Sequence, residues 1–226
     1  MTHPPKLSPS IIERAKRLSS TLLSDAVAEN ISMSASIKPV SKTMKVVGTA
    51  TTVSLRPTDN LFLHQAIYSG EEGYVLIADG KGELSNAYLG ELMIRAAKAI
   101  GLEGIVIDGA IRDREALEDI NFPIFSAGFV PNGPLKDGPG TQQSVITCGG
   151  VVITPGDLVV GDADGVTVVP QHLVEDALTK AERKLDYEKE RIAAIEEYEL
   201  KRKEGQTPPP IEPKWLAEKI KPYITN

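Results

Sequence analysis

The stretch YLGELMIRAAKAIGLEGIVIDGAIRDREAL, residues 88–117, decides the fold. Its first part has apolar side chains at helical spacing and ends at Gly101, a residue type that readily adopts the left-handed conformation that closes a helix. Residues 104–107 (GIVI) are then apolar on both faces and too few for a helix, which is typical of a central parallel strand. The stretch therefore predicts a helix, a buried strand and a polar turn into a second helix.

The polar turn lies at residues 108–113 (DGAIRD), directly after the predicted strand. Ligands of open α/β sheets bind beyond the carboxyl ends of the strands, so a site is expected here. Arg112 offers a planar fork for a carboxylate or an enolate oxygen, and Asp113 offers a hard oxygen for a divalent cation. Residues 90–93 open the preceding helix, and their backbone N–H groups can hold a carboxylate or a phosphate.

A purely structural interpretation explains the same residues without any chemistry. Asp113 would then be the N-cap of a helix over residues 114–119, and Arg112 would be a surface charge. On the local sequence alone this second interpretation is favoured, because Arg-Asp dipeptides are common.

The pattern G-E-L-M-x-x-A-A-x-x-x-G-x-x-G-I-V-I-D-G-A-I-R-D occupies residues 90–113. It resembles the signature of the RraA-like family, which contains 4-hydroxy-4-methyl-2-oxoglutarate aldolases, oxaloacetate decarboxylases and the regulator of ribonuclease E activity. Further motifs follow the expected order, so the resemblance covers about residues 20 to 180. These motifs are SDA at 24–26, GTATTV at 48–53, PGD at 155–157 and DGVTVVP at 164–170.

The resemblance implies a role for each residue of the turn and the helix start. In aldolases of this family the Gly-Glu turn and the Arg bind substrate, and the Asp holds the metal. Arg112 and Asp113 are accordingly the expected catalytic residues, with Asp113 as the metal ligand. The expected substrate-binding residues are Gly90, Glu91, Leu92, Met93 and Arg112. Many members carry an acid three residues after the Asp, whereas Ala116 stands there in this chain and Glu115 is one place early.

The activity that the resemblance implies is that of a divalent-metal-dependent (class II) pyruvate aldolase, a carbon–carbon lyase. It would cleave small 4-hydroxy-2-oxo acids such as 4-hydroxy-4-methyl-2-oxoglutarate and also decarboxylate oxaloacetate. Both reactions leave a pyruvate enolate, which Mg²⁺, Mn²⁺ or another divalent cation stabilises. The competing mechanism is a lysine Schiff base, but the surroundings of Lys81 and Lys98 do not predict a desolvated amine. The proton-transferring group stays open among Glu91, Asp108 and an acidic residue of an adjacent chain.

Two other functions stay open. One is a non-catalytic RraA-like regulator that binds a ribonuclease or helicase partner, with which Arg112 and Asp113 are equally compatible. The other is a phosphocarrier-like swivelling domain, which needs a reactive histidine in an exposed loop. None of His3, His64 and His172 lies in a recognisable loop of that kind.

Alternating short apolar strands and helices predict an α/β layered domain. The resemblance implies a three-layer α/β/α domain with a mixed central sheet, assembled as a homotrimer or a hexamer. We expect an N-terminal arm and helix over residues 1–19, the catalytic domain over 20–180, and a C-terminal helical extension and tail over 181–226. Residues 173–204 lack Gly and Pro and predict one long helix, after which GQTPPP at 205–210 predicts a stiff Pro-rich tail.

Three segments are predicted to be irregular. Residues 1–8 are polar and Pro-rich and are expected to form a loose arm. Residues 128–143 hold much of the Gly and Pro of the chain and predict a long loop, of the kind that often forms a lid or an interface. Residues 79–82 (DGKG) follow another predicted strand and are interpreted as a turn, with Asp79 as a neighbour of the site.

The composition disfavours a nucleic-acid-binding, disulfide-stabilised or membrane-spanning protein. A net charge of −6 disfavours a nucleic-acid binder, because neutralising phosphates needs a basic face. A single cysteine, Cys148, excludes an internal disulfide framework and suits a reducing compartment. No apolar run reaches the roughly 18 residues of a membrane span, and the N-terminus lacks a secretory signal. We therefore expect a cytoplasmic protein without nucleic-acid or membrane partners.

Overall fold

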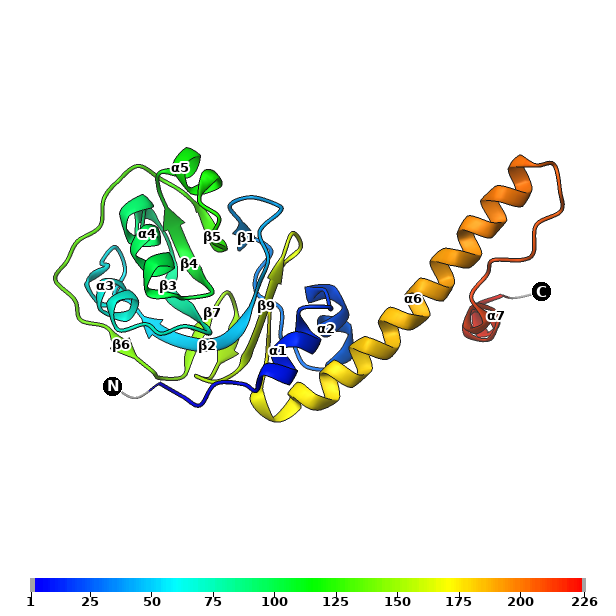
Figure 1. Ribbon diagram of the computed structural model, residues 1–226, viewed down its shortest axis with the longest axis horizontal. Helices are drawn as coiled ribbons and strands as arrows, with labels where there is room; N and C mark the ends of the chain where they lie inside the picture. Colours follow the sequence, from blue (N-terminus) through cyan, green and yellow to red (C-terminus); the bar gives the residue numbers. More distant parts are fainter. Residues whose placement is uncertain (1–2, 225–226) are drawn as a thin grey trace. The chain divides into compact units, whose positions relative to one another are not determined.

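The computed structural model describes residues 3–224 (Figure 1). The chain divides into two compact units, Met1–Glu182 and Arg183–Asn226. Within the described residues, every strand belongs to the first unit, where most of them form one eight-stranded sheet. The order along this sheet is β1, β5, β4, β3, β2, β9, β10, and the short β6 pairs with β2.

The sheet is mixed. Its strands are β1 (Lys38–Pro39), β2 (Val46–Ser54), β3 (Tyr74–Ala87), β4 (Gly104–Ile111), β5 (Ile124–Phe129), β6 (Thr141–Gln142), β9 (Leu158–Asp162) and β10 (Gly165–Val169). Strands β2 to β5 are parallel to one another, whereas β1, β6, β9 and β10 each pair antiparallel with a neighbour. The prediction of an α/β chain with a mixed sheet is confirmed.

The central strands are buried on both faces because successive side chains point to opposite sides. In β3, Leu76 and Ala78 join one buried apolar cluster, whereas Val75 and Ile77 join another. The same alternation occurs in β4, where Ile105 joins the first cluster and Val106 joins the second. This arrangement explains why residues 104–107 are apolar without a polar alternation.

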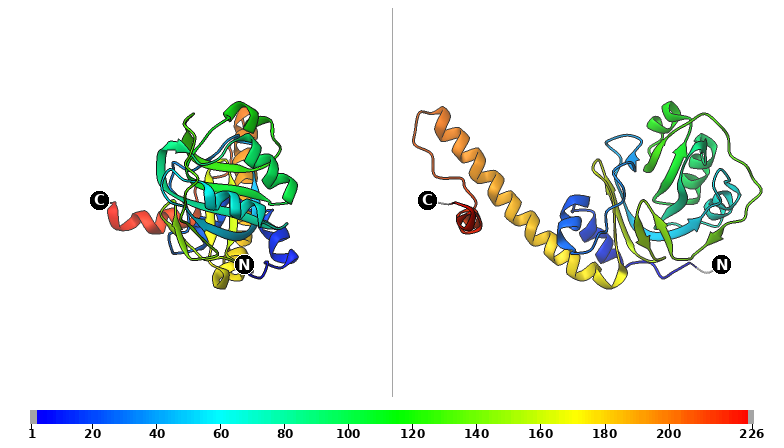
Figure 2. Two further views of the ribbon diagram at one scale, coloured as in Figure 1. Left: turned by 90° about the vertical axis from the view of Figure 1, so that its left-hand side faces the viewer. Right: turned by 180° about the vertical axis from the view of Figure 1, so that it is seen from behind.

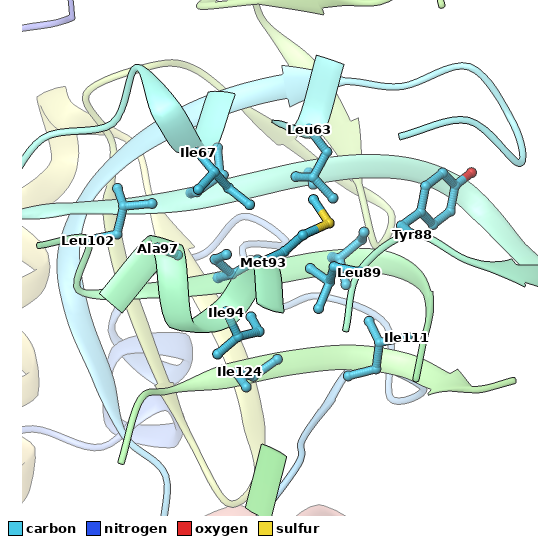
Figure 3. Close-up of a cluster of buried hydrophobic side chains, with 14 of the residues drawn as sticks. Leu63, Ile67, Tyr88, Leu89, Met93, Ile94, Ala97, Leu102, Ile111 and Ile124 are labelled. Atoms are coloured by element: carbon cyan, nitrogen blue, oxygen red, sulfur yellow. The ribbon is translucent and has the colours of Figure 1, made fainter. Parts of the chain in front are cut away.

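Two helices cover the first face of the sheet, as Figure 3 shows. Leu63 and Ile67 of α3 (Leu61–Tyr68) face Met93 and Ala97 of α4 (Glu91–Ile100) over the central strands. The predicted helix closes as expected, because Gly101 adopts a left-handed conformation with φ of 100°. The short α5 (Arg114–Asp119) follows β4.

The second face is covered differently from the predicted α/β/α layering. Its cluster is closed by the antiparallel hairpin of β7 (Ile146–Cys148) and β8 (Val151–Ile153) and by residues that precede β1. The sheet curls around this interior (Figure 2). Close approach within it is possible because Gly161 has no side chain, since a Cβ there would lie 2.8 Å from Phe125 Cζ. The β7–β8 hairpin thus lies on the face where the α/β/α layering predicts helices.

The remaining helices of the first unit are α1 (Pro9–Ala15), α2 (Ser20–Ala26) and the start of α6 (Val174–Lys203). Helix α1 contacts β2, and α2 contacts β9 and β10. The start of α6 is joined to α1 by ion pairs of Arg14 with Glu175 and Glu182.

The segment before α1 is not the loose arm that the sequence predicts. The Leu7 N–H donates to Thr49 Oγ1 at 3.0 Å, and the Tyr74 hydroxyl donates to the Pro4 carbonyl. For residues 3–8 the prediction of a loose arm is therefore wrong.

The second unit contains the rest of α6 and α7 (Lys214–Ile220). The long helix predicted over residues 173–204 is confirmed by α6, which has 30 residues. Residues 206–212 form neither helix nor strand, and the Arg191 guanidinium donates to the Ile211 carbonyl. The stiff conformation expected for the Pro-rich residues stays a prediction. No helix within residues 3–224 is long and apolar enough to cross a membrane.

The predicted irregular loop separates β5 from β6 and is fastened to the start of α3 by Asp59. The buried Asp59 carboxylate accepts the N–H groups of Asp137 at 2.6 Å, Gly138 at 3.0 Å and Leu61 at 3.0 Å. Burial alone would raise the pKa of Asp59, but these donors outweigh burial and lower it. Residues 130–140 are therefore held against α3 rather than hanging free.

Replacing Asp59 with alanine should leave the buried N–H of Gly138 and the partly buried N–H of Asp137 without an acceptor. We expect the free energy of unfolding, measured by urea titration, to fall by about 2–4 kcal/mol. The control Asp137→Ala removes an exposed carboxylate from the same loop and should change stability by less than about 0.5 kcal/mol. Equal losses from the two variants would contradict the anchoring role.

The same anchor predicts a dependence of stability on pH. Because the pKa of Asp59 is lowered in the folded chain, its contribution is complete above the ordinary aspartate pKa. The contribution is lost as the pH falls through the lowered value. The gap in stability between the native chain and Asp59→Ala should therefore narrow on strong acidification.

Candidate functional site

A pocket of about 200 Å³ lies beyond the carboxyl ends of β3 and β4. It is lined by the start of α4, the end of β4, α3 and the loop between β5 and β6. The lining residues are Asn60, His64, Ala87, Tyr88, Leu89, Gly90, Leu92, Met93, Arg112, Asp113, Pro134 and Lys136. Five of the six predicted site residues are in this set, and Glu91 is the exception. The Glu91 carboxylate instead pairs with Arg95 at 2.7 Å on the surface of α4.

A larger cavity of about 420 Å³ lies at the amino ends of β2, β4 and β5. It is lined by Lys45, Lys98 and Glu103 among others, and it contains none of the predicted site residues. Volume alone therefore does not identify the candidate site. The smaller pocket is the stronger candidate because the predicted chemical groups meet there.

The side chain of Asp113 does not have the structural role that its place in the sequence suggests. It precedes α5, but its side chain makes no capping hydrogen bond to that helix. Its Oδ2 instead accepts the N–H of Glu91 at 2.9 Å and so caps α4. The backbone of Asp113 is left-handed, with φ of 64°, an uncommon conformation that clusters at functional sites. Asp113 therefore occupies the N-cap position of α5, as the sequence suggests, but its carboxylate is bonded to the start of α4 instead.

Gly90 makes room for this contact. A Cβ at Gly90 would lie 2.2 Å from Asp113 Oδ2 and 3.1 Å from Arg112 Cγ. The backbone of Gly90 is extended, with φ of −148°, so space rather than conformation requires glycine here. The Gly-Glu pair of the sequence pattern therefore has a physical reason: it lets an aspartate reach the start of α4.

Arg112 stands beside Asp113 at the mouth of the pocket. Its Nε lies 3.9 Å from Asp113 Oδ2, and the side chains of Arg112 and Asp113 are 45% and 43% exposed. The Arg112 N–H donates to the Leu89 carbonyl at 3.0 Å, which joins the end of β4 to the turn before α4. Within residues 3–224 the guanidinium makes no ion pair closer than this 3.9 Å contact, so its fork can receive a ligand oxygen.

The first turn of α4 contributes backbone donors. The N–H groups at the start of a helix have no acceptor within the helix, and the helix dipole favours an anion there. Asp113 occupies the N–H of Glu91, so Leu92 and Met93 supply the donors that remain for a ligand. Of the backbone N–H groups expected to bind a ligand over residues 90–93, that of Glu91 is therefore already bonded to Asp113.

Other lining residues were not predicted as part of the site. Asn60 Nδ2 donates to the Tyr88 carbonyl at 2.7 Å, whereas its buried Oδ1 has no partner within the described chain. Burial, followed by the positive charge of Lys136, lowers the pKa of His64. Local sequence gives neither residue a place in the site, because His64 lies in no recognisable phosphocarrier loop and Lys136 lies in the predicted irregular loop 128–143. Their meeting depends on the tertiary structure.

Two other acidic residues near the strand ends are occupied elsewhere. The buried Asp79 carboxylate pairs with Lys81 Nζ and accepts the Ser54 hydroxyl at 3.3 Å. The Asp108 carboxylate accepts the Gly149 N–H at 3.0 Å, in the β7–β8 turn. Neither residue lines the pocket, but the pKa of the lining residue Tyr88, which burial raises, is raised further by the nearby Asp79. Asp113 is the acidic residue among those that line it.

A cation in this pocket would bind mainly through Asp113. Within residues 3–224, no group of three or more His, Cys, Asp or Glu side chains is arranged to hold a metal ion. Asp113 Oδ1 has no hydrogen-bond partner among the described residues and is open to a ligand. One carboxylate with water and substrate oxygens suits Mg²⁺ or Mn²⁺, which keep several waters. The residues present therefore fit such an ion.

Comparisons with known proteins agree with the sequence pattern. Residues 20–168 match the family model RraA-like, described as Aldolase/RraA. Over 184 residues the chain is 41% identical to a Halalkalibacterium halodurans protein named "Putative 4-hydroxy-4-methyl-2-oxoglutarate aldolase", covering 81% of this chain and 88% of that one.

Solved structures show the same fold. An uncharacterized protein from Pseudomonas syringae pv. tomato superposes with a TM-score of 0.76 at 28% identity, over 85% of this chain and 95% of that one. The RNA-processing inhibitor RraA from Thermus superposes with a TM-score of 0.62 at 28% identity, over 67% and 92% of the two chains. The chain therefore belongs to the RraA-like family.

Proposed function

We propose that the chain is a divalent-metal-dependent lyase that acts on small 2-oxo acids. Its reactions would be aldol cleavage of 4-hydroxy-2-oxo acids such as 4-hydroxy-4-methyl-2-oxoglutarate, and decarboxylation of oxaloacetate. The observation that carries this proposal is the meeting of Arg112, Asp113 and the start of α4 around one pocket. The similarity to the Halalkalibacterium protein supports it.

The chain's own groups suit a reaction that forms an enolate. The N–H groups of Leu92 and Met93 would bind the carboxylate next to the keto group of the substrate. The Arg112 fork would contact the keto oxygen, where negative charge develops as the bond between C3 and C4 breaks. Because these donors are fixed by α4 and β4, they need little reorganisation during the reaction.

Asp113 would hold the cation through its open oxygen while its other oxygen stays on the Glu91 N–H. When bound, a divalent cation supplies Lewis-acid stabilisation of the developing enolate charge, of several kcal/mol. The hydrogen bond from Glu91 and the left-handed backbone keep the Asp113 carboxylate aimed into the pocket. The protein thus contributes one firmly oriented ligand.

A Schiff-base mechanism needs a free lysine amine near the substrate. Lys81 is engaged by Asp79 and lies outside the pocket, and Lys98 does not line it. Lys136 is the lysine that does line the pocket. The two mechanisms therefore make different predictions about metal and about Lys136.

A chelator should abolish the release of pyruvate from oxaloacetate, and added Mg²⁺ or Mn²⁺ should restore it. The reason is that the site offers oxygen ligands that suit these ions. The assay is a coupled measurement of pyruvate, with the rate in the same metal concentration without protein subtracted. Full activity in excess chelator, or a substrate adduct trapped by borohydride, would favour the lysine mechanism.

Exchanging Asp113 for asparagine should lower activity and metal affinity without destabilising the fold. Asparagine tolerates the left-handed backbone and its amide oxygen can still accept the Glu91 N–H, so the melting temperature should change little. Losing the carboxylate should lower metal affinity and kcat roughly 10- to 100-fold. Glu115→Gln, which removes an acid outside the pocket, is the matched control. Near-normal activity and metal response of Asp113→Asn would contradict the site, and a non-catalytic regulator would then be the leading function.

Exchanging Arg112 for lysine keeps the charge but removes the planar fork. We expect kcat/KM for oxaloacetate to fall roughly 10- to 100-fold, because one point charge replaces a bidentate contact. The control is Arg114→Lys, at an exposed arginine that pairs with Glu118 on α5. Equal activity of the two variants would show that the fork has no role.

We also propose that the chain assembles as a trimer or a hexamer. Exposed apolar side chains support this, among them Leu92, which lines the pocket and is 83% exposed, and Leu84 and Leu135. Light scattering at micromolar concentration should give three or six times the chain mass of 24.3 kDa. A particle of the mass of a single chain would refute the assembly.

A further inference from the structure

The loop between β5 and β6 places one lysine in the wall of the pocket. Lys136 lies between Leu135, whose backbone pairs with the segment before α3, and Asp137, whose N–H is held by Asp59. The backbone on each side of Lys136 is therefore fixed. A charge presented from such a position is oriented at a lower entropic cost than one on a free loop.

Lys136 has no carboxylate partner within residues 3–224, although it lies close enough to His64 to affect its titration. The acid that lines this pocket is Asp113. Asp113 already receives the Glu91 N–H and stands beside Arg112. The ammonium group of Lys136 is thus left for an anion from outside the chain.

The pocket carries more positive than negative charge, which also favours an anionic ligand. Arg112, Lys136 and the start of α4 are positive, against the single carboxylate of Asp113. A divalent cation held by Asp113 would add further positive charge. A substrate with one carboxylate would leave one of the cationic groups without a partner, whereas a substrate with two would neutralise both ends of the pocket.

Building on the proposed function, we infer that Lys136 is a specificity-determining residue that binds the second carboxylate of the substrate. His64 lies beside it on α3 and can donate a hydrogen bond from its neutral ring to the same group. The 2-oxo end of the substrate meets Arg112 and α4, and the far carboxylate meets Lys136. The pocket therefore selects dicarboxylic 2-oxo acids over monocarboxylic ones.

The test compares a dicarboxylate and a monocarboxylate on the same variants. Decarboxylation of oxaloacetate reports on both ends of the pocket. Exchange of the methyl protons of pyruvate for deuterium, followed by NMR with Mg²⁺ present, needs only enolate formation at the 2-oxo end. Lys136→Met should raise KM for oxaloacetate about tenfold or more and leave the exchange rate of pyruvate within about twofold.

Two further variants sharpen the comparison. Lys136→Arg keeps the positive charge and should recover most of the affinity for oxaloacetate, but it cannot form an imine with a keto group. Lys98→Met removes an exposed lysine of α4 that does not line this pocket and should match the native chain in both assays. Equal loss of both reactions in Lys136→Met, or no loss in either, would overturn the subsite. Inactivity of Lys136→Arg would overturn it in favour of a catalytic amine.

A measurement of ligand binding tests the carboxylate subsite independently of the proposed lyase activity. Calorimetry with 2-oxoglutarate, an unreactive dicarboxylate, and with pyruvate requires no turnover. Lys136→Met should weaken binding of 2-oxoglutarate about tenfold or more and binding of pyruvate about twofold at most. A native chain that performs neither reaction but shows this difference would contradict the lyase and retain the subsite. Equal weakening of the two ligands would contradict the subsite itself.

Discussion

The hydrogen bond from the Glu91 N–H to Asp113 joins the start of α4 to the end of β4, 22 residues later in the chain. It depends on two local conditions: Gly90 has no side chain to obstruct the carboxylate, and Asp113 adopts a left-handed backbone. The bond brings a carboxylate, a guanidinium and the free N–H groups of a helix start to one place. Without it, Asp113 would be an ordinary residue of a surface turn.

The buried core holds the two partners of this bond in position. Tyr88 and Leu89 are fully enclosed in the cluster between α3, α4 and the sheet, so the turn before Gly90 has little freedom to move. The same packing sets α3 beside α4, which adds Asn60 and His64 to the pocket. Asp59, at the start of α3, then fixes the loop that supplies Lys136. Each wall of the pocket is thus positioned by apolar packing or by buried backbone hydrogen bonds.

Local signals in the sequence predicted the elements around the site, because helical spacing, the Gly101 closure and the β-branched run are each short-range. They could not show that Asp113 caps α4, since that contact spans two elements and local spacing favours a cap on α5. The same limit applies to Asn60, His64 and Lys136, which enter the pocket only through tertiary packing. The predicted second helical layer failed because the sheet curls and a hairpin fills its interior, which strand periodicity does not encode.

The most direct test of the site is a crystal structure of the protein with Mg²⁺ and pyruvate. The ion should lie about 2.1 Å from Asp113 Oδ1, with Oδ2 still accepting the Glu91 N–H. The pyruvate keto oxygen should lie within hydrogen-bonding distance of the Arg112 guanidinium, and its carboxylate should face the first turn of α4. An ion bound away from Asp113, or pyruvate bound outside this pocket, would contradict the account.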